Sequence, residues 1–233
     1  MEAARKIGFF GNCCVRNVRY EAESRRFKVN DNLGFDEIAS RAGLRVTDFS
    51  KFGCTVTKAE SYIEKMFPVI YGDLVFMDFG RYDSDCDWKA VSDSPLERHG
   101  EVTPLNQFIE AYDRIIDHVL KLRKMPVLAT LMPVDARSHI DHVCRTENLN
   151  RDNVLRWLAG GYNKIEESGK IYSDAVKELA FRREVPVIDI RQAFEEQGKK
   201  GNLLREDGFT VSDAGHRVIR DCFERFVFDY LTF

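Results

Sequence analysis

The sequence has no long hydrophobic run and no excess of charge of one sign. Its longest apolar stretches, near 73–79 and 127–133, are far shorter than the ~20 residues that a membrane-spanning helix needs. Its 35 basic and 38 acidic residues give a formal net charge of −3, and the Lys and Arg residues are scattered among acids. The sequence therefore predicts no membrane span, no membrane-surface patch and no nucleic-acid interface, and it favours a small-molecule partner.

A disulfide pattern is also missing. The six cysteines show neither dense disulfide spacing nor a C-x-x-C pair, so we expect free thiols and no disulfide. Residues 1–6 lead directly into a short apolar segment at 7–10, which leaves no room for a secretory signal. We therefore expect a cytoplasmic protein without a metal ion or another cofactor, and no feature of the sequence indicates its oligomeric state.

What the sequence does contain is an alternation of short β-branched or aromatic segments with longer amphipathic ones. This alternation is typical of βαβ units that build a parallel sheet. The five predicted strands cover residues 6–10, 44–49, 74–79, 126–131 and 185–190. A length of 233 residues favours a single domain over 1–233, and the predicted architecture is a three-layer α/β/α fold around a five-stranded parallel sheet, of flavodoxin-like type.

Apolar residues recur near every 3.6 positions between these strands, which predicts helices. One helix is expected to begin at Thr103–Pro104, because Thr is a good N-cap and Pro suits the first helical position. A second is expected over 152–183, interrupted or bent at its glycines, and a third over 213–231.

Two stretches are predicted to be long loops, over 81–102 and 132–151. Each follows the carboxyl end of a predicted strand, and ligands bind at that edge of open α/β sheets. Loops of this length in a compact domain are usually functional or disordered. We therefore look for a site at this edge.

The first candidate motif is Gly11-Asn12-Cys13, which ends the first predicted strand. The chain is expected to turn from there towards a helix, where backbone N–H groups and the helix dipole would lower the pKa of a thiol. Cys13 is thus a candidate nucleophile. The alternative is that Cys13 is a small buried residue beside a tight turn.

Three further motifs follow in order along the chain: Gly53 after the second strand, Gly80-Arg81-Tyr82-Asp83 after the third, and the 207–210 segment before the last helix. Each by itself is an ordinary turn or helix start. Together with Gly11-Asn12-Cys13 they resemble the four sequence blocks of the SGNH (GDSL-type) hydrolases. The other predicted elements match the same template, so the resemblance covers nearly the whole chain.

The resemblance implies a catalytic serine, a histidine and an aspartate, and the sequence departs from it at two of these positions. Cys13 stands where that family has its serine, and Thr210 stands where it has its histidine. Asp207 stands where it has the aspartate that orients the histidine, Tyr82 replaces an asparagine, and Asn12 replaces an aspartate. The catalytic residues implied are Cys13 and Asp207, without a general base from this block.

The resemblance also implies an oxyanion hole, formed by the N–H groups of Cys13 and Gly53 with Tyr82 in place of the asparagine. Asn12, Asp83 and Thr210 are expected to line the pocket. The leading interpretation is a hydrolase of an ester or acetyl group on a small metabolite or carbohydrate, with Cys13 as nucleophile.

A catalytically silent member of the fold, which binds a ligand or partner, is the alternative. The absence of a histidine at Thr210 and the presence of Tyr82 favour it. His99, His139 and His142 lie in the segments predicted to be loops at the ligand-binding edge, but a solvated histidine is the commoner outcome, and no base is assigned.

Overall fold

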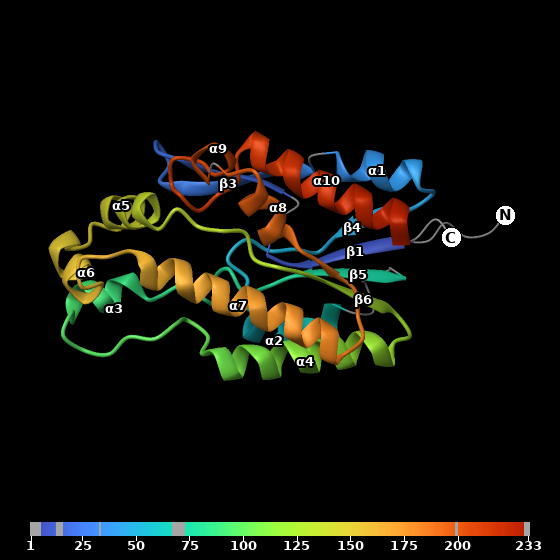
Figure 1. Cartoon of the computed structure of the whole chain (residues 1–233), viewed down its shortest axis with the longest axis horizontal. Helices are drawn as coiled ribbons and strands as arrows, with labels where there is room; N and C mark the ends of the chain where they lie inside the picture. Colours follow the sequence, from blue (N-terminus) through green and yellow to red (C-terminus); the bar gives the residue numbers. More distant parts are fainter. Residues whose placement is uncertain (1–5, 13–15, 33, 67–72, 199, 231–233) are drawn as a thin grey trace.

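The computed structural model describes residues 6–12, 16–32, 34–66, 73–198 and 200–230. Its centre is a five-stranded sheet in the order β4-β1-β5-β6-β7, with every neighbouring pair parallel (Figure 1). The strands are β1 (Lys6–Gly11), β4 (Arg45–Asp48), β5 (Leu74–Asp78), β6 (Met125–Ala129) and β7 (Val187–Ile188). The predicted five-stranded parallel sheet is confirmed, with strand ends shifted by a few residues.

Helices cover both faces of this sheet, and the strand side chains divide between two apolar cores. Phe9 and Phe76 pack in the core on one face, whereas Phe10 and Met77 pack in the core on the other, as the two-residue repeat of a strand requires. One face carries α1 (Phe35–Arg41), α8 (Ile190–Glu196), the short α9 (Lys200–Leu203) and α10 (Asp213–Tyr230). The other carries α2 (Val56–Met66), α4 (Leu105–Lys121) and α7 (Asn163–Arg182).

The stretches predicted to be long loops contain helices, so that prediction is wrong. These helices are α3 (Trp88–Asp93), α5 (Ala136–Thr146) and the start of α6 (Arg151–Trp157). Asp87 caps α3 by accepting from the Ala90 N–H at 2.9 Å, and Asp135 caps α5 by accepting from the Ser138 N–H at 3.2 Å. The three helices bury a third apolar cluster beyond the carboxyl end of the sheet.

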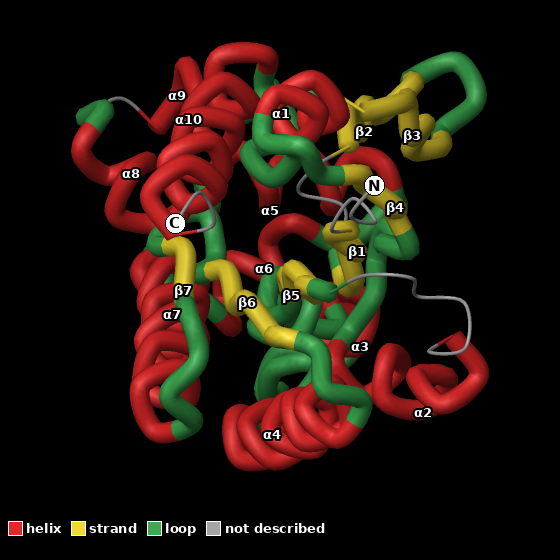
Figure 2. The backbone as a smooth tube through the Cα atoms, turned by 90° about the vertical axis from the view of Figure 1, so that its right-hand side faces the viewer, coloured by secondary structure: helices red, strands yellow, loops and turns green. Residues whose placement is uncertain are grey.

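The helix expected between the first two strands is present as α1, but the chain does not turn into it directly after β1. The chain instead forms a two-stranded antiparallel hairpin, β2 (Arg16–Glu21) with β3 (Arg26–Asn32), and the first helix begins only at Phe35. Figure 2 shows this hairpin standing apart from the row of five parallel strands. Arg16 pairs with Asp48 at the end of β4 and fixes one side of the hairpin.

The remaining predicted helices are present, although the N-cap of α4 is Pro104 and not Thr103 as expected. α4 begins directly after Pro104, and α6 and α7 are separated at Gly160–Gly161, whereas Gly169 lies inside α7. α10 covers the predicted last helix as far as Tyr230. None of the helices in the described ranges has the length and apolar character that a bilayer crossing requires.

Candidate functional site

Residues of the first motif lie at the carboxyl end of β1, in close contact with β5. Gly11 has a φ of 125°, and a Cβ at this position would lie 2.3 Å from the Asp78 carbonyl oxygen, so only glycine fits. The Asn12 N–H donates to the same oxygen at 2.6 Å. Asn12 is buried, and its Oδ1 has no hydrogen-bond partner among the described residues.

Cys13 lies outside the described residues, and its role as a nucleophile stays a prediction. However, the chain continues into β2 at Arg16 and not into the expected helix. A helix dipole directly after Cys13 is therefore not available to lower the pKa of its thiol.

Asp83 braces two of the loops at this edge. Its side chain is fully buried and accepts from the Val56 N–H at 2.9 Å and from the Gly80 N–H at 3.0 Å. Burial raises the pKa of Asp83, and these hydrogen bonds oppose the rise. The carboxyl group thus ties the end of β5 to the loop that carries Gly53.

Asp207 instead closes its own turn. Its Oδ1 accepts from the N–H groups of Phe209 at 2.9 Å and Thr210 at 2.7 Å, and its Oδ2 accepts from the Thr210 hydroxyl at 2.6 Å. The Thr210 hydroxyl therefore forms the hydrogen bond to this carboxylate that the resemblance assigns to a histidine. The turn packs on the start of α5, because a Cβ on Gly208 would lie 2.4 Å from the Asp135 carbonyl oxygen.

Arg81 joins this turn to the end of β6, a role that the sequence did not reveal. Its buried guanidinium donates to the carbonyl oxygen of Met132 at 3.1 Å and to that of Phe209, and it lies 4.2 Å from the centre of the Phe209 ring. Burial lowers the pKa of Arg81 to about 10. The residue occupies the variable position of its block, so no motif marks it.

A mostly apolar hollow at this edge has a volume of about 330 Å³, and we call it the edge cleft. Its lining includes Phe27, Gly53, Tyr82, Trp88, His139 and Phe209. Tyr82 packs edge-on against Phe209 with ring centroids 5.1 Å apart, and Phe27 of the hairpin packs against Phe52 at 4.7 Å. The hairpin therefore forms one wall of the cleft.

A smaller cavity of about 30 Å³ adjoins it and is lined by Asn12, Arg81, Phe209 and Thr210, among others. Phe209 lines both hollows; Asn12 and Thr210 line the smaller cavity, and Gly53 and Tyr82 line the edge cleft. Asp83 and Asp207 lie behind these residues as buried hydrogen-bond acceptors. The described site residues of the sequence analysis thus gather at one edge of the sheet.

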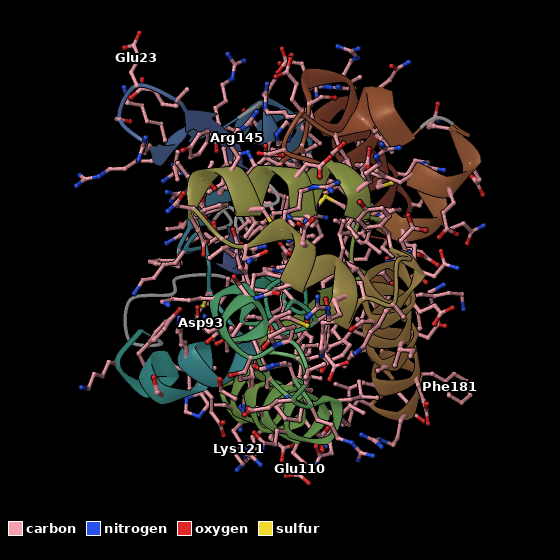
Figure 3. All side chains as sticks on the ribbon, turned by 90° about the vertical axis from the view of Figure 1, so that its left-hand side faces the viewer. Glu23, Asp93, Glu110, Lys121, Arg145 and Phe181 are labelled. Carbon is pink, nitrogen blue, oxygen red and sulfur yellow. The ribbon has the colours of Figure 1, made fainter. Side chains whose placement is uncertain are left out.

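Two histidines of α5 also face this region, although the sequence predicted a loop there. His139 is buried, and its Nε2 lies 3.2 Å from Asp85 Oδ2. His142 packs edge-on against Tyr20 of the hairpin at 4.6 Å; burial lowers its pKa, and the charge of Asp207 opposes this. Figure 3 looks onto this end of the molecule, where Arg145 of α5 lies beside the hairpin.

The other histidines have different surroundings. The His99 ring bonds to the Ser94 carbonyl oxygen at 2.8 Å, and His118 lies in the last turn of α4. His216 is buried in α10, and burial lowers its pKa to about 4. Neither of its ring nitrogens has a partner among the described residues.

No family model matches this chain. It is similar in sequence to an isoamyl acetate-hydrolyzing esterase from Saccharomyces cerevisiae, with 34% identity over 65 residues. That match covers 28% of this chain and 27% of the esterase. The chain therefore aligns with about a quarter of this curated relative.

Similarity to solved structures extends over almost the whole chain. A lipase/acylhydrolase from Enterococcus faecalis superposes with a TM-score of 0.66 at 17% identity, covering 97% of this chain and 96% of that one. A catalytic variant of an acetylxylan esterase from Geobacillus stearothermophilus gives a TM-score of 0.65 at 18% identity, covering 97% and 95%. The chain has the α/β fold of these GDSL/SGNH-type hydrolases, as the sequence blocks predict.

Proposed function

We propose that this protein hydrolyses an ester or acetyl group on a small molecule or an acylated carbohydrate, with Cys13 as the nucleophile. The observation that carries the proposal is the convergence of Gly53, Tyr82 and the Asp207–Thr210 turn on one hollow edge of an esterase-type fold. A cleft with a few polar groups at the carboxyl edge of a parallel sheet is the usual site of a small-molecule ligand.

The substrate class follows from the similar proteins. One of the superposed structures is an acetylxylan esterase, and the curated relative hydrolyses isoamyl acetate. Both names describe esters of acetic acid. The aromatic rings of Phe27, Tyr82 and Trp88 in the edge cleft suit an apolar acyl or alkyl group or the face of a sugar.

In the proposed mechanism the Cys13 sulfur attacks the ester carbonyl carbon, and the oxyanion that develops accepts from the N–H groups of Cys13 and Gly53 and from Tyr82. Asp207 shapes the smaller adjoining cavity by holding Thr210, and its charge acts on His142. The described cysteines near this edge are poor alternatives as nucleophiles. Burial raises the pKa of Cys54, and it raises that of Cys86 to about 12.

Turnover of acetyl esters by cysteine variants tests the proposal. With p-nitrophenyl acetate and acetylated xylo-oligosaccharides as probes, we expect Cys13→Ala to lower kcat/KM at least ~100-fold, because removal of the nucleophile leaves only binding and oxyanion stabilisation. The matched control is Cys14→Ala, the adjacent thiol, which is expected to change the rate less than about twofold. Limiting iodoacetamide should label Cys13 first among the six cysteines.

Equal rates in Cys13→Ala and the parent protein would contradict the proposed nucleophile. No turnover together with an inert Cys13 would favour the second candidate, a silent protein that binds acylated ligands. The full occupation of Asp207 by its own turn is the observation that favours this candidate. A cytoplasmic location stays a prediction.

A further inference from the structure

The pair His139 and Asp85 has no counterpart in the four sequence blocks. His139 Nε2 lies 3.2 Å from Asp85 Oδ2 and 3.4 Å from its Oδ1. Asp85 Oδ1 also accepts from the Trp88 indole N–H at 2.8 Å and from the Cys86 N–H at 2.9 Å. The carboxylate is therefore held in place by two donors in addition to the imidazole.

This contact fixes which nitrogen of His139 carries the proton. A carboxylate only accepts hydrogen bonds, so Nε2 donates to Asp85 and the neutral ring keeps its lone pair on Nδ1. Nδ1 is buried and has no hydrogen-bond partner among the described residues. A buried acceptor without a partner is destabilising, and such a group calls for a functional explanation.

Aromatic contacts fix the orientation of the same ring. His139 stacks on Phe209 with centroids 4.9 Å apart and planes 25° apart, and it meets Trp88 edge-on at 6.2 Å. Phe209 directly precedes Thr210 in the chain, so the imidazole lies against the turn that lacks a histidine of its own. It also lines the edge cleft together with Gly53 and Tyr82.

From these contacts we infer that His139, positioned by Asp85, is the proton acceptor of the hydrolysis. The inference rests on the proposed function. As the Cys13 sulfur bonds to the carbonyl carbon, its proton moves to Nδ1, and that proton then passes to the alkoxide oxygen as the C–O bond breaks. In the second step Nδ1 takes a proton from water, the water oxygen bonds to the acyl carbon, and the C–S bond breaks as the proton returns to sulfur.

The charged groups around His139 come from several elements. Asp85 faces it from the loop after β5, and His142 and Glu147 follow it along α5. Burial and the negative charges of Asp85 and Asp87 raise the pKa of Glu147. Asp207 acts on His142 from the neighbouring turn. A pH profile of the protein must therefore be compared between variants that differ at one of these groups only.

The test compares His139→Gln with His118→Gln, which alters a histidine on α4 remote from the cleft. We expect His139→Gln to lower kcat/KM for p-nitrophenyl acetate by ~10²–10⁴-fold, because general-base catalysis contributes that factor. His118→Gln should leave kcat/KM unchanged. Circular dichroism and the unfolding midpoint of each variant show whether the fold is retained.

The alkylation of Cys13 by iodoacetamide, measured from pH 5 to 9, gives a readout that needs no turnover. If His139 accepts the thiol proton, we expect His139→Gln to move this profile towards that of an ordinary thiol. Turnover that His139→Gln leaves intact would overturn the inference and leave the proposed function standing. Absent turnover with an unchanged alkylation profile would overturn both, whereas absent turnover with a shifted profile supports the base and counts against the hydrolase.

Discussion

Two histidines of this protein are buried to a similar depth and differ in what surrounds their nitrogens. His139 on α5 is 5% exposed, and His216 on α10 is 3% exposed. Nε2 of His139 lies 3.2 Å from a carboxylate oxygen of Asp85, whereas both nitrogens of His216 are without a partner among the described residues. Burial lowers the pKa of His216 to about 4, so this ring stays neutral at physiological pH.

The difference shows why burial alone does not make a histidine useful for catalysis. A proton acceptor must hold the proton for a time near neutral pH, and a carboxylate beside the ring stabilises the protonated form. His139 has such a carboxylate in Asp85, but no carboxylate of the described residues forms a hydrogen bond with the ring of His216. The same residue type is therefore a proton carrier at the edge cleft and a buried neutral side chain beneath the last helix.

The largest expected effect is the loss of protein stability in acid that protonation of His216 causes. Its pKa is about 4 in the folded protein and about 6.5 when unfolded, so between these values the unfolded chain binds a proton that the folded chain does not. The free energy of unfolding should therefore fall by up to roughly 3 kcal/mol as the pH drops from 6.5 to 4. Urea unfolding of His216→Leu over this range should show a flatter dependence.

His118→Gln serves as the control for this measurement, because it removes a histidine from α4 that is only half-buried. It should keep the slope of the parent protein. Identical slopes for His216→Leu and the parent would mean that the buried ring is not what couples folding to pH.

The next effect tests the carboxylate that distinguishes His139. Asp85→Asn keeps the shape of the side chain, but its amide group can donate to Nε2 and drive the proton onto Nδ1, which then no longer accepts. We expect kcat/KM to fall about 100-fold, equivalent to roughly 2.7 kcal/mol. Nitrogen-15 spectra of the imidazoles should show the change of tautomer in the folded variant.

Asp93→Asn is the matched control, since Asp93 is exposed and pairs with Lys89 on the surface of α3. It should change neither the rate nor the tautomer. A change of tautomer in Asp85→Asn without loss of rate would show that His139 is held by Asp85 but takes no part in the reaction.

Thr210→His would create a fourth buried histidine, this time beside Asp207. Its ring can replace the Thr210 hydroxyl at Asp207 Oδ2, so we expect ester turnover to rise about tenfold, with a loss of about 1–3 kcal/mol in stability from the larger side chain. Thr210→Val, which removes the hydroxyl without adding a base, should show no gain. The effect should be larger with Cys13→Ser, because a serine depends on its base more than a thiol does.

A rescue experiment separates the new histidine from the native one. Thr210→His should restore part of the activity that His139→Gln removes, because it supplies a base at the adjacent position. If Thr210→His lowers turnover in every background, the turn around Asp207 does not serve the reaction.

The sequence predicted the sheet well because its strands are covered on both faces. Strands such as Leu74–Asp78 are buried throughout and stand out as continuous apolar runs. The hairpin was missed because only one of its faces is apolar. Along β2, Val18 and Tyr20 alternate with charged or polar residues. Its partners, Phe52 and His142, come from distant parts of the chain.

In the candidate site, local motifs likewise reveal some residues and not others. Glycines and aspartates at the strand ends were predicted because each belongs to a short motif, and Gly11 and Asp83 have local reasons for their identity. The pair of Asp85 and His139 is 54 residues apart and joins two segments that were predicted to be loops. No local pattern encodes such a contact, since it arises only when α5 packs against the loop after β5.

The smallest expected effect concerns Trp88, whose indole N–H donates to the Asp85 carboxylate. Trp88→Phe keeps an aromatic ring against His139 but removes the indole N–H that donates to Asp85 Oδ1 at 2.8 Å. One hydrogen bond to a charged group contributes about 1.5–3 kcal/mol, but the carboxylate keeps the Cys86 N–H and the imidazole. We therefore expect only a three- to tenfold loss in kcat/KM, about 1 kcal/mol.

Trp157→Phe is the matched control, because this tryptophan packs edge-on against Trp88 and forms no hydrogen bond to Asp85 within the part of the chain that the structure describes. It should stay within about twofold of the parent rate. Equal losses in the two variants would mean that aromatic packing, and not the placement of the Asp85 carboxylate, sets the rate at this edge.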